Sequence, residues 1–238
     1  MYKSLKLLLA ASAIATLAAC GGGGDSTGPA PGPVAAPVTT TFPIKAAYTN
    51  LVRNSSSLQF SLSGSLSGIS VSGGGTITRG TLVSSTFEGV PALRQIATLT
   101  GTVAAGANTA PLAAVISTFV DTNYNPLGSS ADGNYAVISG TVNIPTTAVI
   151  NDTGILYTAN TFTASNKSVR TGTNAVSYAL QPDTSTTGLL KVISVQKNVA
   201  GATTLTSTLT LRIDASGAIT YLNESTAFSN GDSLTLTY

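Results

Sequence analysis

From about residue 44 onward, the chain alternates apolar residues with Ser or Thr, one position at a time. The segments 57–63 (SLQFSLS), 204–213 (TLTSTLTLRI) and 233–238 (SLTLTY) repeat this pattern. A period of two puts successive side chains on opposite faces of an extended chain, which is typical of a half-buried β-strand. Threonine also suits a pleated surface better than a helix, because its branched Cβ loses rotamer freedom in a helix. The alternation therefore predicts an all-β protein.

Turn-forming residues separate the alternating segments, as Asn230-Gly231 does near the end of the chain. We expect strands at the following positions: 57–63, 67–72, 75–79, 81–88, 92–104, 112–120, 134–144, 154–164, 174–180, 189–197, 204–213, 218–228 and 233–238. The last four form an antiparallel meander, the glycines near residue 74 suggest a bulge or tight bend, and residues 46–53 suit a short helical turn. Strands with one polar and one apolar face pack as two sheets or close on themselves. The fold class is therefore an antiparallel meander forming a β-sandwich or β-barrel.

The composition excludes several functional classes. Only 8% of the residues are charged, and the chain has no His, no Trp and one Cys. Zinc sites built on His and Ser-His-Asp triads need an imidazole. The 11 Lys and Arg residues are dispersed, so they form no basic stripe for nucleic acid. Ser and Thr, roughly a quarter of the chain, replace the usual charged surface.

The N-terminus has the organisation of an export signal. A short basic start with Lys3 and Lys6 precedes an apolar stretch over 7–16, and Leu17-Ala18-Ala19-Cys20 closes it with small residues before the cysteine. These residues resemble the lipobox of bacterial lipoprotein signal peptides. The resemblance covers the first 20 residues only.

The lipobox resemblance implies that residues 1–19 are cleaved and that Cys20 becomes the first mature residue. Its thiol would carry a diacylglycerol and its amino group an acyl chain such as palmitate, and two or more chains anchor a protein stably. Gly21 stands where an Asp generally retains lipoproteins in the inner membrane, so the resemblance implies the outer membrane. Residues 20–43 read as the lipidated cysteine and a flexible Gly/Pro-rich tether. Residues 44–238 are expected to form one β-rich domain.

The segment 121–132 (DTNYNPLGSSAD) contains the candidate metal ligands Asp121, Asn123, Asn125 and Asp132. Oxygen-bearing residues at these positions resemble the spacing of an EF-hand Ca²⁺ loop. However, Pro126 stands where a glycine makes the sharp turn, and Asp132 replaces the bidentate glutamate. We therefore favour a polar turn whose Asp and Asn side chains cap their own backbone.

We expect no catalytic residues. Sequence alone does not bring any two carboxylates to the separation that acid–base catalysis of glycoside hydrolysis requires. The carboxylates outside the tether are Glu88, Asp121, Asp132, Asp152, Asp183, Asp214, Glu224 and Asp232. The aromatic end of the chain looks like the final strand of outer-membrane β-barrels, but 6% aromatics without Trp cannot build two interfacial girdles.

The sequence thus predicts a lipid-anchored cell-envelope protein with a non-catalytic structural or binding β-domain. The mature domain is similar to Thr/Gly-rich lipoproteins of unknown function from Gram-negative bacteria, which implies no chemistry. One alternative is a carrier that holds a lipid or other hydrophobic ligand in a β-barrel cavity, and another is an envelope enzyme of unrecognised type. The expected partner is the membrane, through the anchor, and no nucleic acid. The face of the outer membrane, the oligomeric state and any protein partner stay open.

Overall fold

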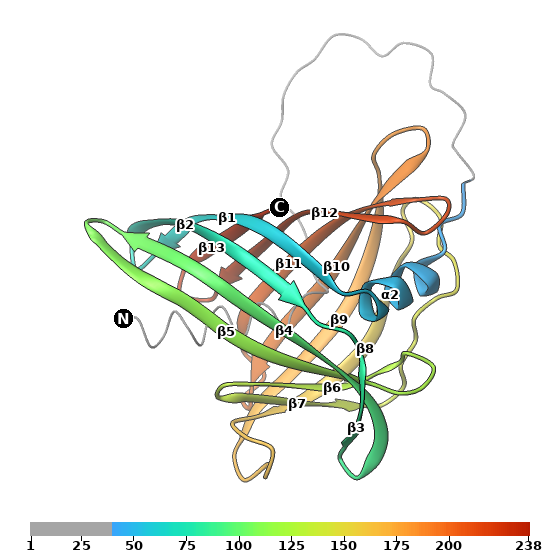
Figure 1. The fold of residues 1–238 in the computed structure, drawn as a ribbon, viewed down its shortest axis with the longest axis horizontal. Coiled ribbons are helices and arrows are strands. Elements are labelled where there is room, and N and C mark those ends of the chain that lie inside the picture. The colour runs from blue at the N-terminus through green and yellow to red at the C-terminus, as the bar shows by residue number, and fades with distance from the viewer. Residues whose placement is uncertain (1–39) are drawn as a thin grey trace.

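The computed structural model describes residues 40–238, which form one antiparallel sheet and a helix (Figure 1). Helix α2 spans Ile44–Arg53. The thirteen strands are β1 (Ser56–Leu66), β2 (Ile69–Arg79), β3 (Val83–Phe87), β4 (Val90–Ala105), β5 (Asn108–Val120), β6 (Pro126–Ala131), β7 (Asn134–Ser139), β8 (Thr153–Phe162), β9 (Arg170–Pro182), β10 (Thr187–Asn198), β11 (Thr203–Asp214), β12 (Ile219–Phe228) and β13 (Ser233–Thr237).

The sheet closes into a barrel. Strands β4 to β13 each pair with the next in sequence, β13 pairs with β1, and β1 pairs with β2. The ring is completed by β2, which pairs antiparallel with β4 from Val71↔Ala105 to Arg79↔Ala97. Twelve strands therefore form the closed wall, and β3 lies outside it as an extra strand on β4. Of the two expected architectures, the structure is the β-barrel.

Apolar side chains line most of the inside of the barrel, and hydroxyl side chains cover much of its outside, where exposed apolar residues such as Val115 and Ile155 also lie. In β11, for example, Leu205, Leu209 and Ile213 are buried while the Thr residues between them are mostly half exposed. This division follows from the alternation in the sequence, because every second side chain of a barrel strand points inward. The hydrophobic core is thus the interior of the barrel.

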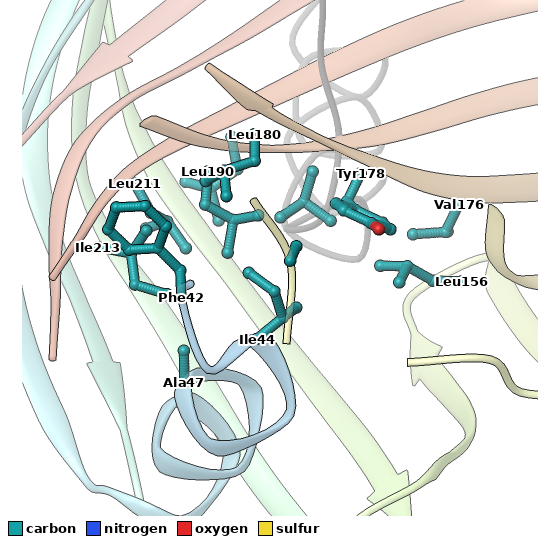
Figure 2. Packing of buried hydrophobic residues seen from close by; sticks show 13 residues of the cluster. Phe42, Ile44, Ala47, Leu156, Val176, Tyr178, Leu180, Leu190, Leu211 and Ile213 are labelled. Carbon is teal, nitrogen blue, oxygen red and sulfur yellow. The ribbon is translucent and has the colours of Figure 1, made fainter. Parts of the chain in front are cut away.

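Helix α2 lies within one end of the barrel (Figure 1). Its buried residues Ile44, Ala47, Tyr48 and Val52 recur at a helical spacing. Ile44 and Ala47, with Phe42 before them, pack against inward side chains of β8 to β11, as Figure 2 shows. Tyr48 and Val52 pack on the opposite side against β5. Among residues 40–238, no helix is long and apolar enough to span a bilayer.

The extra strand β3 covers a small apolar cluster on the outer wall. The ring of Phe87 stacks on Phe119 with centroids 4.5 Å apart and lies 5.5 Å from Tyr135. The phenylalanine sits directly over Gly128, where a Cβ would lie 2.4 Å from the Phe87 ring. The absence of a side chain on Gly128 therefore allows β3 to fold back onto β6.

The expected bulge near residue 74 is wrong. β2 is one continuous strand that pairs residue by residue with β1 from Ser56↔Arg79 to Leu66↔Ile69, so the two strands expected at 67–72 and 75–79 are one. Gly75 lies opposite Gly101 of β4, and a Cβ on Gly75 would lie 2.0 Å from the Thr100 carbonyl oxygen. The glycines permit a close approach of the β2 and β4 backbones at the seam of the barrel, which is the β2–β4 pairing that closes the ring. They do not break the strand.

The C-terminal meander is confirmed, with β10 to β13 close to the expected ranges. The helical turn expected at 46–53 is a full helix that begins at Ile44. The main strand missing from the prediction is β6. Its sequence PLGSSA has no alternation, begins with Pro and has Gly at its third position. It forms because β5 and β7 offer hydrogen-bonding edges on both of its sides.

The close approach at the seam predicts a large effect of one methyl group. Gly75→Ala should lower the free energy of unfolding by about 2 kcal/mol or more, because the new Cβ collides with rigid backbone that cannot move independently. Gly80→Ala is the matched control, since its nearest neighbour would be at an ordinary 3.5 Å. Urea unfolding of both variants measures the difference. Equal stability of the two variants would contradict the role given to Gly75.

Candidate functional site

The barrel interior contains a cavity of about 100 Å³ beside helix α2. Tyr48, Leu51 and Val52 of the helix line it on one side, and inward residues of β2 and β4 to β9 line the rest. A second, apolar space of about 20 Å³ lies between α2 and β8 to β11. The larger cavity is the only one of the two with charged and amide side chains in its lining, so it is the candidate site.

Arg79 is the buried cation of this cavity. It is the last residue of β2 and only 8% exposed, and its side chain lines the cavity. The guanidinium Nη1 donates a hydrogen bond to the hydroxyl of Tyr221. The guanidinium carbon also lies 5.1 Å from the centroid of the Tyr221 ring, an arrangement suited to cation–π attraction. The part of the chain that the structure describes contains two ion pairs, Lys167–Glu88 and Arg212–Asp183, and neither includes Arg79.

Glu224 on β12 is the buried carboxyl of the described chain, and the charge of Arg79 acts on it. It is 2% exposed, and its Oε1 accepts a hydrogen bond of 3.0 Å from Ser207 while Oε2 accepts one of 3.4 Å from Tyr238. Burial raises the pKa of Glu224 to about 7, although the Ser207 hydrogen bond, the charge of Arg79 and the Tyr238 hydrogen bond oppose the shift. Burial likewise raises the pKa of Tyr238 far above its ordinary value. The carboxyl therefore keeps its proton at acidic pH and releases it around pH 7.

Two amide side chains also line the cavity, along with the hydroxyl side chains of Thr118 and Ser129. Asn174 on β9 accepts a 2.5 Å hydrogen bond from the hydroxyl of Ser194 through Oδ1. Gln95 on β4 donates to the carbonyl oxygens of Val52 at 2.9 Å and Gly80 at 3.0 Å. Gln95 thereby ties the last turn of α2 to the barrel wall, because it satisfies a helix carbonyl that has no partner within the helix.

The structure brings together three of the four candidate Ca²⁺ ligands. Asp121 Oδ1 accepts the backbone N–H groups of Asn123 and Asn125, each at 2.8 Å, and Oδ2 accepts the Asn125 amide at 2.9 Å. The ammonium of Lys45 donates to Asn125 Oδ1 at 2.6 Å. Asp132 lies beyond the far end of β6, about 20 Å along the chain for a six-residue strand. Among residues 40–238, no group of three His, Cys, Asp or Glu side chains is placed to hold a metal.

The other candidate residue, Cys20, lies outside the described residues, as does the lipobox around it. The remaining carboxylates are dispersed. Glu88 pairs with Lys167 and accepts the Tyr135 hydroxyl, and both hydrogen bonds lower the pKa of Glu88. Asp183 pairs with Arg212 on the outer wall, and Asp214 caps the turn after β11. These side chains have structural partners at separate places on the barrel.

Sequence reasoning included Glu224 among eight carboxylates but did not single it out, and it missed Arg79. The signal for Arg79 was available, since the alternation of β2 puts it on the same face as the buried Ile77. No comparable signal placed Tyr221 beside it. β12 contains a bulge at Leu222, between the pairs Thr210↔Asn223 and Leu211↔Tyr221, and this extra residue turns both Tyr221 and Glu224 inward.

The fold and its interior define a closed antiparallel β-barrel with an internal helix and a small, partly polar cavity. Comparison of the chain with protein families, curated proteins and solved structures gives no match.

The raised pKa of Glu224 predicts that stability falls as the pH rises. The folded protein holds this proton up to about pH 7, whereas the unfolded chain releases it near the ordinary glutamate pKa of 4.5. Folding therefore loses about 2 to 3 kcal/mol between about pH 5 and pH 8 through this group. Glu224→Gln should remove that loss, measured as the free energy of urea unfolding at the two pH values.

Asp132→Asn is the control for Glu224→Gln, because Asp132 is exposed in the turn between β6 and β7. This variant should keep the pH dependence of the wild-type protein. A Glu224→Gln variant with the same slope as wild type would show that this carboxyl ionises normally inside the barrel.

Proposed function

We propose that this is a lipid-anchored protein of the bacterial cell envelope whose β-barrel is a non-catalytic structural or binding module. The observation that carries the proposal is the polarity of the barrel, apolar inside and hydroxyl-bearing outside. A barrel that spans a membrane has the opposite arrangement, with an apolar band facing the lipid. A barrel of this polarity needs a separate device to stay at a membrane, and a lipidated Cys20 would supply it.

The outer wall shows this polarity over several neighbouring strands. Ser72, Ser63, Thr235, Ser225 and Thr208 lie directly opposite one another on β2, β1, β13, β12 and β11. These side chains are exposed or half exposed. Such a row of hydroxyls hydrogen-bonds to water, and burying it in lipid without partners would cost free energy at each position. The row supports a barrel that stands in an aqueous compartment of the envelope.

The size of the cavity favours a structural or small-ligand role over the carriage of a whole lipid. Pockets for ordinary small molecules measure roughly 300–1,000 Å³, whereas the cavity here measures about 100 Å³. Helix α2 takes up the space at its end of the barrel that an acyl chain would need. The proposed module is therefore one whose interior is largely filled by its own side chains.

The proposed anchor predicts that Cys20→Ser releases the protein from membranes. Without the thiol there is no diacylglycerol, and an uncleaved signal is the remaining apolar segment. Mature protein should move from the membrane pellet to the soluble fraction, and any protein left in the pellet should have the mass of the uncleaved precursor, as fractionation and the mass of the intact protein would show. Gly22→Ser, two residues further on, is the control and should stay anchored. Mature Cys20→Ser protein that remains fully in the membrane pellet would refute the anchor.

The residue after the cysteine predicts the membrane to which the protein goes. Gly21→Asp should transfer the protein from the outer to the inner membrane fraction, since an Asp at that place generally retains lipoproteins there. Separation of the two membranes on a density gradient measures the shift. The same Gly22→Ser variant should remain with the outer membrane. An unchanged distribution of Gly21→Asp would contradict the proposed sorting.

A further inference from the structure

The cavity beside helix α2 has a mixed lining, with a buried cation next to an apolar patch. The guanidinium of Arg79 on β2 lines it, and the amide of Asn174, which is 4% exposed, lines it from β9 on the other side of the barrel. Beside Arg79, on the same wall, lie the apolar side chains of Ile77, Leu99 and Ile116, which are at most 4% exposed. A ligand that fits such a space has a polar head and a short apolar body.

The positive charge of Arg79 determines which polar head group of a ligand the cavity would bind. An arginine stays protonated and offers five N–H donors in a rigid fork. The hydrogen bond to Tyr221 uses one of these donors, on Nη1. The buried carboxyl of Glu224 accepts its hydrogen bonds from Ser207 and Tyr238 and forms no ion pair with Arg79 in the described part of the chain. A buried cation of this kind is stabilised by an anion that accepts two parallel hydrogen bonds, which a carboxylate does.

The volume limits the body of the ligand. A water molecule needs about 10–15 Å³ of cavity measured in the same way, so 100 Å³ holds roughly seven to ten non-hydrogen atoms. A carboxylate uses three of these and leaves a chain of about four or more carbons. A membrane phospholipid or a long-chain fatty acid is much larger.

We propose that the barrel cavity binds a short-chain aliphatic carboxylate, with its head on Arg79 and its chain against Ile77, Leu99 and Ile116. Tyr221 holds the guanidinium in place through its hydroxyl and its ring. The inference rests on the binding role proposed for the barrel, but it does not depend on the lipid anchor. Membrane release of Cys20→Ser and loss of ligand binding are therefore separate measurements.

The test is calorimetric titration of the purified full-length protein in a non-ionic detergent with sodium pentanoate. We expect one pentanoate per chain with a Kd below about 1 mM. 1-Pentanol and pentylamine should bind at least about tenfold more weakly, because they lack the carboxylate. Acetate and chloride should also bind at least about tenfold more weakly, because they lack the apolar chain.

Substitutions then assign the site. Arg79→Met should weaken pentanoate binding at least about tenfold, whereas Arg170→Met, an exposed arginine at the start of β9, should leave it unchanged. Ala97 on β4 pairs with Arg79 on β2 and lines the cavity. Ala97→Leu therefore adds side-chain volume to the cavity next to Arg79 and should abolish binding. Ala113→Leu, an exposed alanine on β5, is the matched control for added volume. If Arg79→Met fails to fold, as judged by circular dichroism, Ala97→Leu and Arg79→Lys take its place.

Several outcomes would overturn the proposal. No heat with any carboxylate means that the cavity is a packing feature only. Equal binding of pentanol and pentanoate means an apolar cavity without an anion site, and equal binding of chloride means a simple anion site. Tighter binding of hexadecanoate, or a lipid retained in native mass spectrometry, means that the interior opens into a lipid carrier. Unchanged binding by Ala97→Leu places the ligand elsewhere.

Discussion

The pairing of β2 with β4 is the contact on which the whole architecture depends. It joins the two ends of a twelve-stranded sheet and leaves no free edge in the ring. β3 is the next strand in the chain after β2, but β2 pairs with β4 instead. Without this pairing the sheet would be open. The pairing is possible because Gly75 and Gly101 face each other without side chains, so that the backbones come together where a Cβ would collide.

Closure with twelve strands creates a second requirement. An eight-stranded barrel is just wide enough for its own side chains to fill it, and the diameter grows with strand number. The wider interior here needs additional apolar atoms, and helix α2 provides them (Figure 2). Its contacts reach β8 to β11 on one side and β5 on the other. The space that the helix leaves beside it is the cavity lined by Arg79.

Four of the polar side chains inside the barrel form one connected region. Arg79, Tyr221, Glu224 and Tyr238 come from β2, β12 and the end of the chain, and only closure of the sheet brings these segments around one interior. Burial of an arginine and a carboxyl costs free energy unless each has partners. Tyr221 and Ser207 reduce that cost. A ligand carboxylate on Arg79 would reduce it further, which is the physical basis of the proposed site.

The sequence by itself determined the strands, the faces of the strands and the class of fold. Alternation such as that of 204–213 predicts which side chains are buried. The same alternation in β2 puts Arg79 on the same face of the strand as Ile77. It did not determine β6, whose sequence lacks alternation and which forms only between β5 and β7. Nor did it reveal the bulge at Leu222, because a bulge is set by the register with β11 and not by local residue preference. The choice of barrel over sandwich depended on the pairing of β2 with β4, and this closure also brought together Arg79 and Tyr221, which are 142 positions apart. Such long-range contacts have no local pattern, so the tertiary structure alone decided the site.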